Sequence, residues 1–425
     1  NENLPLDTIE ALAWGSDLDW GFNKHPPFSA FAVEVFYVIF GNQDWAYYLL
    51  SQIFIVSSFI FVFKLSKEFL NNDILAFFSV LLLEGIFFFN YTSPEFNVNI
   101  SQLPFWALSV LFTWRGIKHE KFQDFLLLGI FIGFGILSKY IFLFLVVGIK
   151  LLFIYLVAIK KIKSYNFLVV GPTVLIVIFP HLVWLIDNNF VTLSYGIQRA
   201  EGFGGLIDHL YFPLSLMGKQ MIVLIPFFLM IVFLIKKGKF KKINFNEKII
   251  FLIFTCLLPI FLMILTSAIM GVKIRTMWMT PFYLFFGLLF MEIFQKYINL
   301  KKLNSFYFTF LIFFIISPLI YSAVSVSNEF KRTDYPGKEI ARLVQEKWDK
   351  NFRNEIKIVV GDEWYAGNLS YHLTSRPKWT IEIKEKTKDL RDDQGVVYTG
   401  NPKILKKICP GVFGTIRPVG YCMIG

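Results

Sequence analysis

Ten long apolar stretches dominate the sequence between residues 43 and 323. A helix needs about 20 apolar residues to cross a bilayer, whereas a membrane barrel shows short alternating strands. Hydrophobic residues make up 55% of the chain and 51 of its 425 residues are Phe, which is more apolar surface than a soluble domain buries. The sequence therefore predicts a mainly α, polytopic helical membrane domain. The predicted spans are 43–65, 74–91, 98–114, 123–138, 140–159, 166–186, 211–235, 249–270, 277–295 and 304–323.

Two flanking segments differ in composition from this membrane domain, which we place at 43–324. Residues 1–42 form a carboxylate-rich outer loop, in which 28–41 is predicted to be a helix lying in the membrane interface. Residues 325–425 are predicted to form a small soluble α/β domain. Its helix carries Ile340, Leu343, Val344 and Trp348 on one face, and strands are expected at 357–360, 378–383 and 395–399. Residue 1 is Asn rather than Met, and the sequence leaves open whether a membrane helix precedes it.

Positive charge in short loops predicts the orientation, because such loops stay on the cytoplasmic side. Alternate loops carry seventeen Lys and Arg residues, including the runs 236–242 and 301–302, whereas the intervening loops carry four. Both chain ends are therefore predicted to lie outside. The net charge of +11 mainly reflects this topology, and no nucleic-acid-binding module accompanies it. Cys409 and Cys422 in the outward tail form either a disulfide or two free thiols, and Cys256 is interpreted as a packing residue.

Two carboxylates near the start of the chain are candidates for chemistry. Asp7 and Glu10 are three residues apart and share one face if the segment is helical. One of them could act as general base for an acceptor hydroxyl. Acidic loops facing water are common, however, and spacing alone favours that simpler interpretation.

Polar groups inside or beside the predicted spans are further candidates. Glu84 falls within a span, where an ionisable group is costly and usually faces a cavity or a partner. Asn97 and Asn99 stand at the outer mouth of the next span. Their amides could bind sugar hydroxyls or could cap the helix that begins there, and the sequence favours neither.

Cations are scarce on the outer face, so the few that occur there are informative. Lys139 lies at a helix junction, and Lys273 and Arg275 share one short loop. Such side chains could hold the phosphate of a membrane lipid or simply anchor the protein to headgroups. His25 and His181 have no metal-site spacing, so hydrogen bonding is the favoured role. No nucleotide-binding or nucleophile-elbow motif is present, which disfavours a soluble nucleotide-sugar donor.

Several motifs in collinear order resemble one known family. They are Leu6 to Gly15, Leu18 to Gly21, Lys24-His25-Pro26-Pro27, Pro94 to Asn97, Leu103 to Leu108, Gly135 to Tyr140, Pro180 to Trp184, Gly271 to Pro281 and Val360 to Asn368. Together they resemble the polytopic class C glycosyltransferases, namely the bacterial aminoarabinose transferases of lipid A and the protein O-mannosyltransferases. Each motif alone is weakly specific, and the likeness runs over nearly the whole chain.

The resemblance implies a class C glycosyltransferase fold and an inverting transfer of sugar from a polyprenyl-phosphate donor. Asp7 matches the catalytic loop carboxylate, with Glu10 beside it, and Lys139 and Arg275 match the donor-phosphate cluster, with Lys273 as a neighbour. Substrate contacts are expected from a further group: Lys24, His25, Glu84, Asn97, Asn99 and His181. Asn99 departs from the Asp of many relatives, which leaves a second loop carboxylate unassigned. The resemblance leaves a divalent metal open, but no ligand set maps onto this chain.

The resemblance also implies an acceptor and a location. The acceptor would be a hydroxyl or phosphate of an envelope glycolipid such as lipid A or lipopolysaccharide. The enzyme would be a multi-pass protein of the bacterial inner membrane, with its active site and C-terminal domain in the periplasm. The alternative is a lipid or solute transporter without catalysis. Transporters usually show internal repeats and polar groups near the midplane, and neither feature is evident here.

Overall fold

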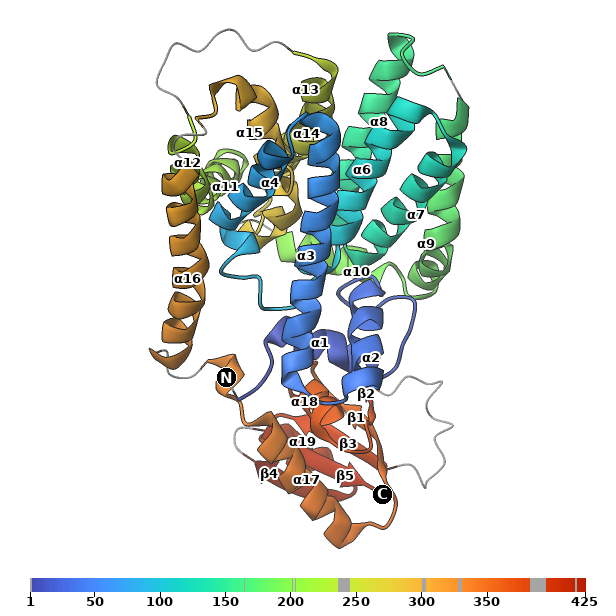
Figure 1. Ribbon diagram of the computed structural model, residues 1–425. Helices are drawn as coiled ribbons and strands as arrows, with labels where there is room; N and C mark the ends of the chain where they lie inside the picture. Colours follow the sequence, from blue (N-terminus) through green and yellow to red (C-terminus); the bar gives the residue numbers. More distant parts are fainter. Residues whose placement is uncertain are drawn as a thin grey trace.

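The computed structural model describes residues 2–163, 165–200, 202, 204–235, 245–299, 303–327, 331–382, 395–416 and 419–425. It consists of a helical membrane domain and a C-terminal α/β domain, with two short helices, α1 and α2, at their junction (Figure 1). Both termini lie at the end of the molecule that carries the C-terminal domain (Figure 1). This arrangement agrees with the prediction that the two ends share one side.

The helices of the first half are regular, apart from short 3-10 segments. They are α1 (Leu6–Gly15), α2 (Phe28–Phe40), α3 (Asp44–Phe69), α4 (Asp73–Leu81), η1 (Leu82–Gly85), η2 (Phe87–Phe89), α5 (Val98–Ser101), α6 (Leu103–His119), α7 (Phe122–Ser138), η3 (Tyr140–Phe142), α8 (Leu143–Ala158), η4 (Tyr165–Val169) and α9 (Val170–Asp187).

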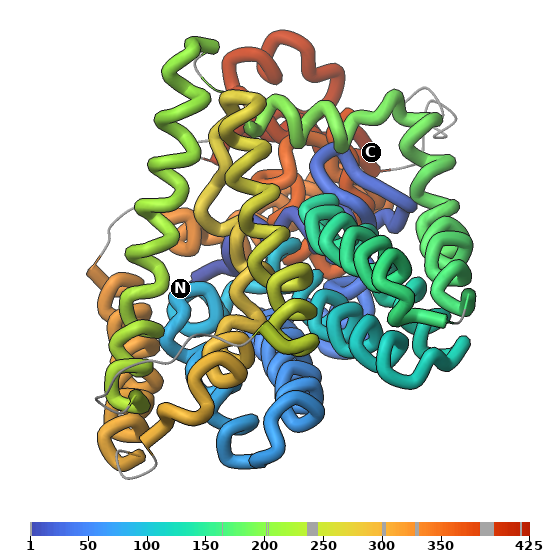
Figure 2. The backbone as a smooth tube through the Cα atoms, turned by 90° about the horizontal axis from the view of Figure 1, so that it is seen from above, coloured from blue at the N-terminus to red at the C-terminus, as the bar shows by residue number. Residues whose placement is uncertain are grey.

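The second half of the membrane domain contains more breaks. Its elements are α10 (Val191–Ala200), α11 (Asp208–Val223), α12 (Ile225–Val232), α13 (Glu247–Leu252), the π-helical turn η5 (Ile253–Leu257), α14 (Leu258–Met270), η6 (Thr276–Tyr283), α15 (Phe286–Phe294), η7 (Gln295–Tyr297) and α16 (Leu303–Ser327). Helix α10 runs across the direction of its neighbours at one edge of the bundle (Figure 2).

The number of spans differs from the sequence expectation. Within the described residues, five helical segments are long and apolar enough to cross a membrane, or up to seven if two bent pairs each count as one span. The bent pairs are α11 with α12, at 45°, and η6 with α15 and η7, at 48°. The three remaining predicted spans, 74–91, 98–114 and 123–138, correspond to shorter or broken helices. The count of ten therefore stays a prediction.

Glycines explain why some of these helices approach closely. On α7, a Cβ at Gly129 would lie 2.6 Å from Thr173, and one at Gly133 would lie 2.5 Å from Val177. Both neighbours belong to α9, so the two helices pack through a small-residue stripe, as membrane helices commonly do. Gly85 interrupts the predicted span 74–91 and lies against the backbone of Phe227. No side chain fits at that crossing of η1 and α12.

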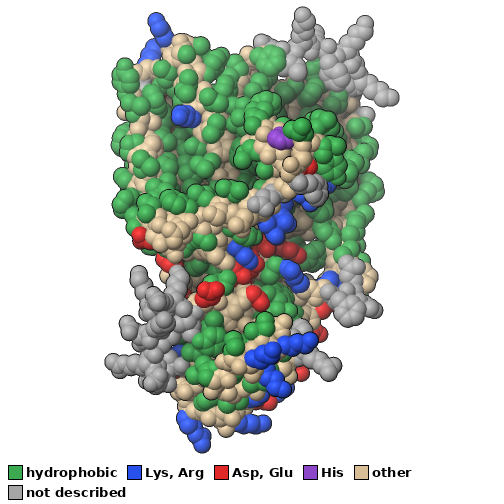
Figure 3. Space-filling view, turned by 180° about the vertical axis from the view of Figure 1, so that it is seen from behind, with side chains coloured by type: hydrophobic (Ala, Val, Ile, Leu, Met, Phe, Trp, Pro, Cys, Tyr) green, Lys and Arg blue, Asp and Glu red, His purple; other side chains and the backbone are tan. Residues whose placement is uncertain are grey.

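Apolar side chains cover the sides of the membrane domain (Figure 3). Helix α16 illustrates this, because Phe306 is its one buried residue within the described chain and most of its Phe, Leu and Ile side chains are exposed. In water this exposed apolar surface would be unfavourable, whereas in a membrane it would contact lipid chains. Cys256 is buried, in line with its interpretation as a packing residue.

The C-terminal domain contains one mixed sheet. Its elements are η9 (Arg332–Asp334), α17 (Gly337–Asn351), β1 (Ile356–Val360), α18 (Tyr365–His372), β2 (Lys378–Thr380), β3 (Gly395–Gly400), α19 (Pro402–Ile408), β4 (Val412–Ile416) and β5 (Val419–Ile424). The strand order is β2-β1-β3-β5-β4, with β1 parallel to both β2 and β3 and the β5 pairings antiparallel. The fold class predicted from the sequence is confirmed.

The details of this domain match the sequence in part. Ile340, Val344 and Trp348 are buried on α17 as predicted. Of the predicted strand 378–383, residues 378–380 form β2, and residue 383 lies outside the described residues. Strands β4 and β5 were not anticipated. Cys409 and Cys422 form a disulfide, with their Cα atoms 5.6 Å apart, which settles the pairing that the sequence left open.

Helix α1 is held between the two domains. Gly367 of α18 lies against Ile9 and Ala13, where an added Cβ would come within 3.2 Å of both. Arg376 completes the clamp by donating to the Leu12 carbonyl at 2.7 Å and to Glu34 of α2 at 2.8 Å. The C-terminal domain therefore fixes the helix on which the candidate catalytic carboxylates stand. The predicted interfacial position of α2 stays a prediction.

Candidate active site

Acidic and basic side chains gather between the apolar membrane domain and the C-terminal domain (Figure 3). Asp7 lies within electrostatic range of Lys24 and Lys139. Helix α1 buries Ile9, Leu12 and Ala13 and leaves Asp7 exposed near its first turn. The predicted helix, and with it the shared face of Asp7 and Glu10, is therefore present.

Two effects act in opposite directions on the pKa of Asp7. Although the Asp7 side chain reaches solvent, the protein around it displaces much of the water near the carboxyl, and this desolvation raises the pKa of Asp7. Four cations counteract the effect: Lys139, Lys24, Arg199 and Arg332. These cations come from four separate segments of the chain. A carboxylate with a raised pKa that remains accessible is suited to accept a proton from a substrate.

Glu10 forms a salt bridge, whereas Asp7 forms none among the described residues. Lys24 Nζ lies 2.7 Å from Glu10 Oε1 and 3.1 Å from Glu363 Oε1 of the C-terminal domain. Burial raises the pKa of Glu10, Lys24 lowers it, and the charges of Asp7 and Glu363 raise it again. The pKa of Lys24 is raised, because its two carboxylate partners outweigh the effect of burial. Glu10 and Lys24 thus form a paired unit near Asp7.

His25 is neutral in this environment. Burial and the nearby charges of Lys139, Lys24 and Arg199 lower the pKa of His25 to about 3. Its ring packs edge-on against Trp14 and Tyr195, with centroids 6.0 Å apart in each case. A neutral imidazole beside these cations offers a hydrogen-bonding group without adding charge.

Lys139 lies at the junction between α7 and η3 and so belongs to the membrane domain. Its Nζ donates to Asn99 Oδ1 at 2.5 Å and lies 5.3 Å from the centre of the Trp278 ring. Burial lowers the pKa of Lys139 to about 7, Asp7 raises it, and Arg275 lowers it. The structure therefore brings Lys139, Asn99, Asp7 and Arg275 close to one another.

The two cations of the membrane domain, Lys139 and Arg275, have no carboxylate at salt-bridge distance within the described residues. Among the described residues, neither Lys139 nor Arg275 forms a salt bridge. Arg275 Nε is buried without a hydrogen-bond partner in the described part of the chain. Charged groups placed this way are usually compensated by a ligand, because unpaired buried cations are costly. An anionic ligand would satisfy both.

The two amides at the start of α5 have different roles. The Asn97 side chain accepts from the backbone N–H groups of Asn99 and Ile100, at 2.8 and 3.3 Å, and so caps α5. Asn99 instead bonds to Lys139 and is buried. Of the two interpretations left open by the sequence, capping describes Asn97, and Asn99 belongs to the charged site.

Three predicted residues lie apart from this cluster. Glu84 Oε1 accepts from Asn90 at 2.6 Å, a local contact within the η1–η2 region. His181 is buried: its Nδ1–H donates to the Trp20 carbonyl at 2.5 Å and its Nε2 accepts from Tyr140 at 2.7 Å. Lys273 is exposed, and its backbone N–H donates to Ala200. His181 thus supports loop 16–27, as the favoured hydrogen-bonding role implied.

Four site residues were not singled out from the sequence: Glu95, Arg199, Arg332 and Glu363. The pKa of Glu95 is raised by burial and by the charge of Asp7, and the Tyr321 hydroxyl donates to Glu95 Oε1 at 3.3 Å. Glu95 and Glu363 stand inside quoted motifs, and Arg199 is one of the four outer cations, so each had a signal. Arg332 had none, because it lies beyond the last predicted span.

The described residues do not fit a metal centre. No group of three or more His, Cys, Asp or Glu side chains within them converges on one point. Glu10 and Glu363 both contact the Lys24 ammonium. The lysine ammonium occupies the position that a metal cation would need between these carboxylates.

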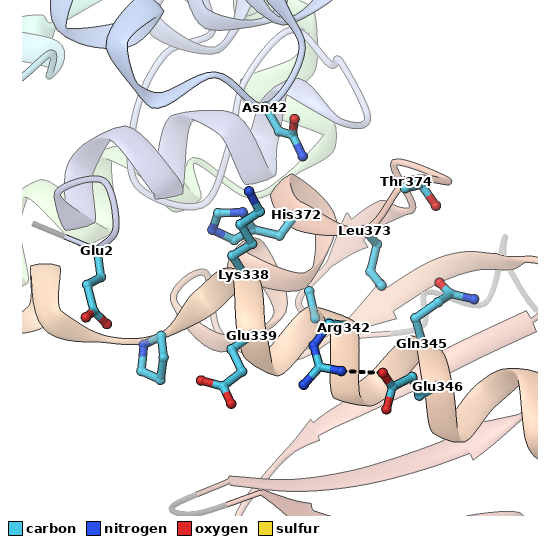
Figure 4. A pocket seen from close by; sticks show the side chains of 12 residues that line it. Glu2, Asn42, Lys338, Glu339, Arg342, Gln345, Glu346, His372, Leu373 and Thr374 are labelled. Atoms are coloured by element: carbon cyan, nitrogen blue, oxygen red, sulfur yellow. Dashed lines mark hydrogen bonds and ion pairs between the residues drawn. The ribbon is translucent and has the colours of Figure 1, made fainter.

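Two cavities flank the C-terminal domain. One of about 870 Å³ lies between loop 17–23, the α9–α10 junction and the β1–β2 edge of the sheet. The other, of about 650 Å³, lies among α17, the end of α18 and the start of the chain, and Arg342 and Glu346 form an ion pair beside it (Figure 4). Neither is lined by Asp7, Lys139 or Arg275.

The fold and the site together define a polytopic membrane protein whose charged centre lies beneath an α/β domain. Residues 24–184 match the family model of dolichyl-phosphate-mannose-protein mannosyltransferases. The fold is similar to that of ArnT from Cupriavidus metallidurans bound to undecaprenyl phosphate, with a TM-score of 0.60 and 12% identity over 99% of this chain and 94% of that one. The apo state of the same protein gives a TM-score of 0.55 and 11% identity over 100% and 94%.

Comparison with curated protein sequences gives no match. The likeness to ArnT covers both domains, and the mannosyltransferase match covers α2 to α9 together with the loop that carries Lys24 and His25. The resemblance to polytopic class C glycosyltransferases that the motifs indicated is confirmed.

Proposed function

We propose that this protein is a membrane glycosyltransferase that moves a sugar from a polyprenyl-phosphate donor to an acceptor on an envelope glycolipid. The observation that carries the proposal is the pair Lys139 and Arg275, cations without a salt-bridge partner in the described chain, beside the accessible carboxylate Asp7. ArnT from Cupriavidus metallidurans, whose fold is similar, binds undecaprenyl phosphate in its crystal structure. An anionic lipid of that kind matches an unpaired cationic pair at a membrane boundary.

The chemistry divides between the two groups. Lys139 and Arg275 would hold the donor phosphate and stabilise the negative charge that develops as the bond between the sugar C1 and the phosphate oxygen breaks. Asp7 would accept the proton of the acceptor hydroxyl while that oxygen forms the new bond to C1 from the opposite face. The configuration at C1 is thereby inverted, polyprenyl phosphate leaves, and Asp7 later releases its proton to water.

The finer assignments are part of the same proposal. The acceptor is a hydroxyl or phosphate group of a glycolipid such as lipid A, and the transferred sugar is a pentose or hexose. The site and the C-terminal domain face the periplasm, and the helical domain lies in the inner membrane. Clustering of the charges at the end of the bundle, rather than midway along it, supports an enzyme over the transporter alternative.

Mass spectrometry of envelope lipids tests this proposal. Cells that express the wild-type chain should contain a glycolipid heavier by one pentose, hexose or related sugar residue than cells without the gene. The mass should be absent when Asp7→Asn replaces the wild type at equal protein level. A lipid profile that does not change with the gene, in cells supplied with polyprenyl-phosphate sugars, would refute the transferase activity.

A further inference from the structure

The turn that follows β1 fixes the backbone position of Glu363. Gly361 has a φ of +146°, and a Cβ there would lie 2.2 Å from Thr399 Oγ1, so the strand leaves the sheet through a turn that only glycine fits. Asp362 Oδ1 then accepts from the backbone N–H groups of Trp364 and Tyr365, at 2.9 and 2.8 Å, and caps α18. Glu363 is therefore fixed between a glycine turn and a helix start.

The Glu363 side chain points out of its own domain. It is 8% exposed, and its Oε1 accepts from Asn23 Nδ2 at 2.8 Å and lies 3.1 Å from Lys24 Nζ. Within the described C-terminal residues it forms no ion pair with a cation of its own domain. A nearly buried carboxylate in this position is stable only because the loop of the first 27 residues supplies the compensating charge.

Lys24 is consequently held from two directions. Glu10 on α1 contacts it at 2.7 Å and Glu363 at 3.1 Å, so the ammonium lies between two carboxylates that are more than 350 residues apart in the chain. With both carboxylates ionised the three groups carry a net charge of −1, which makes Lys24 a poor phosphate ligand. Its ammonium is instead held within electrostatic range of Asp7, whose ionised form it favours.

We propose that Glu363 is a positioning residue for sugar transfer: it holds Lys24 against Glu10 and thereby couples the docking of the C-terminal domain to the reaction centre at Asp7. This inference rests on the proposed function. Glu363 itself touches no substrate in this scheme. Its contribution passes through the Lys24 ammonium, whose placement depends on both carboxylates.

A double-mutant cycle on the full-length protein in nanodiscs tests the proposal. The variants are Glu363→Gln, Lys24→Met and the two combined, and transfer is followed by mass spectrometry with the host membrane's polyprenyl-phosphate sugars and glycolipids. Glu363→Gln should lower the maximal rate about tenfold, because a small displacement of a positioned group is costly in a catalytic site. The half-saturating donor concentration and the affinity for undecaprenyl phosphate should stay within about twofold, since the unpaired cations remain in place.

The cycle separates positioning from a merely structural role. Once Lys24→Met has removed the ammonium, adding Glu363→Gln should lower the rate no further, and Glu363→Asp should recover part of the wild-type rate. Glu346→Gln is the matched control, because Glu346 is an exposed glutamate of the same domain whose partner is Arg342. It should leave the rate unchanged. Binding of undecaprenyl phosphate verifies that each variant is folded.

The possible failures point to different conclusions. Effects of the two substitutions that simply multiply, or a Glu363→Gln variant as fast as wild type, would overturn the positioning role while leaving the transferase activity intact. A wild-type protein that binds undecaprenyl phosphate but transfers no sugar would refute the proposed function itself, and with it any role of Glu363 in transfer.

Discussion

Two groups of charges lie near Asp7, and they differ in how their cations are compensated. Lys24 contacts two carboxylates, Glu10 and Glu363, which come from α1 and the C-terminal domain. Lys139 and Arg275, from the membrane domain, form no salt bridge among the described residues, and Lys139 has the neutral Asn99 as its hydrogen-bond partner. Charge that the protein itself compensates maintains structure, whereas charge that it leaves uncompensated marks where an anionic ligand belongs.

Asp7 connects the two groups. It lies within electrostatic range of both Lys24 and Lys139, and its side chain remains exposed. Removing charge from the compensated group and removing it from the uncompensated group should therefore affect donor binding and transfer differently. The following experiments test this difference.

The largest effect is expected at Asp7 itself. Asp7→Asn removes the proton acceptor without changing the side-chain volume, and the transfer rate should fall by roughly 100- to 10,000-fold. Binding of undecaprenyl phosphate should persist, since the cations stay in place. The rate is measured by mass spectrometry of the product. Asp17→Asn is the control, because Asp17 is an exposed aspartate paired with Lys378, and its rate should match wild type. A variant of Asp7 that kept a tenth of the wild-type rate would contradict the assignment.

The second effect distinguishes the two lysines directly. Lys139→Met should weaken binding of undecaprenyl phosphate by about 10- to 100-fold, the range expected when a hydrogen bond to a charged group is lost. Lys24→Met removes a charge of the same sign but should change this affinity by less than about threefold, because Lys24 is already neutralised by its partners. Titration of the purified protein with undecaprenyl phosphate measures both. Equal losses in the two variants would abolish the distinction between compensated and uncompensated charge.

A smaller effect concerns pH. The pKa of Lys139 is lowered to about 7, so the ammonium is present below that pH and is lost progressively above it. Affinity for undecaprenyl phosphate should accordingly fall as pH rises from 7 to 8, by severalfold and at most about tenfold per pH unit. Lys139→Arg keeps its charge throughout this range and serves as the control, because the lipid phosphate titrates identically in both experiments. The ratio of the two affinities should change with pH, and a constant ratio would show that Lys139 does not titrate there.

The smallest effects separate the two amides. Asn99→Ala should weaken donor binding by about three- to tenfold, because the hydrogen bond that positions the Lys139 ammonium is lost. Asn97→Ala should leave that affinity unchanged and lower the stability of α5 by about 1 kcal/mol, the usual cost of a lost helix cap. Donor titration and thermal unfolding of each variant provide the two measurements. Loss of donor binding in Asn97→Ala alone would reverse the assignment.

The sequence predicted some parts of this arrangement better than others. Apolar length located seven of the helical spans or bent pairs, but it overlooked the break at Gly85, where η1 crosses α12 closely, and the break at Gln102 between α5 and α6. The strands β4 and β5 escaped prediction because they are short and Gly-containing, so their alternation is weak. The lysine run 236–242 and Lys301 and Lys302, which supported the predicted orientation, lie outside the described residues.

In the candidate site, too, the sequence indicated some residues but not the contacts that they form. The intramembrane position of Glu84 favoured function, yet its partner is Asn90, six residues away, and this local contact had no signature in the sequence. Glu363 was visible in a motif, but its partner lies at position 24. Residue type, scarcity and the family resemblance singled out Asp7, Lys139 and Arg275 as candidates, while the role proposed for Glu363 depends on the docking of a separate domain.

By itself the sequence determined the membrane helices, the soluble tail and the chemical kinds of group available at one face, because hydrophobic length and charge are local properties of the chain. The tertiary structure decided which cation is compensated and which is left for a ligand. That choice depends on close contacts between segments far apart in sequence, such as the 3.1 Å between Lys24 and Glu363. Lys24 and Lys139 are both outward lysines by composition, and only the packing of α1 between two domains makes one of them structural and leaves the other available.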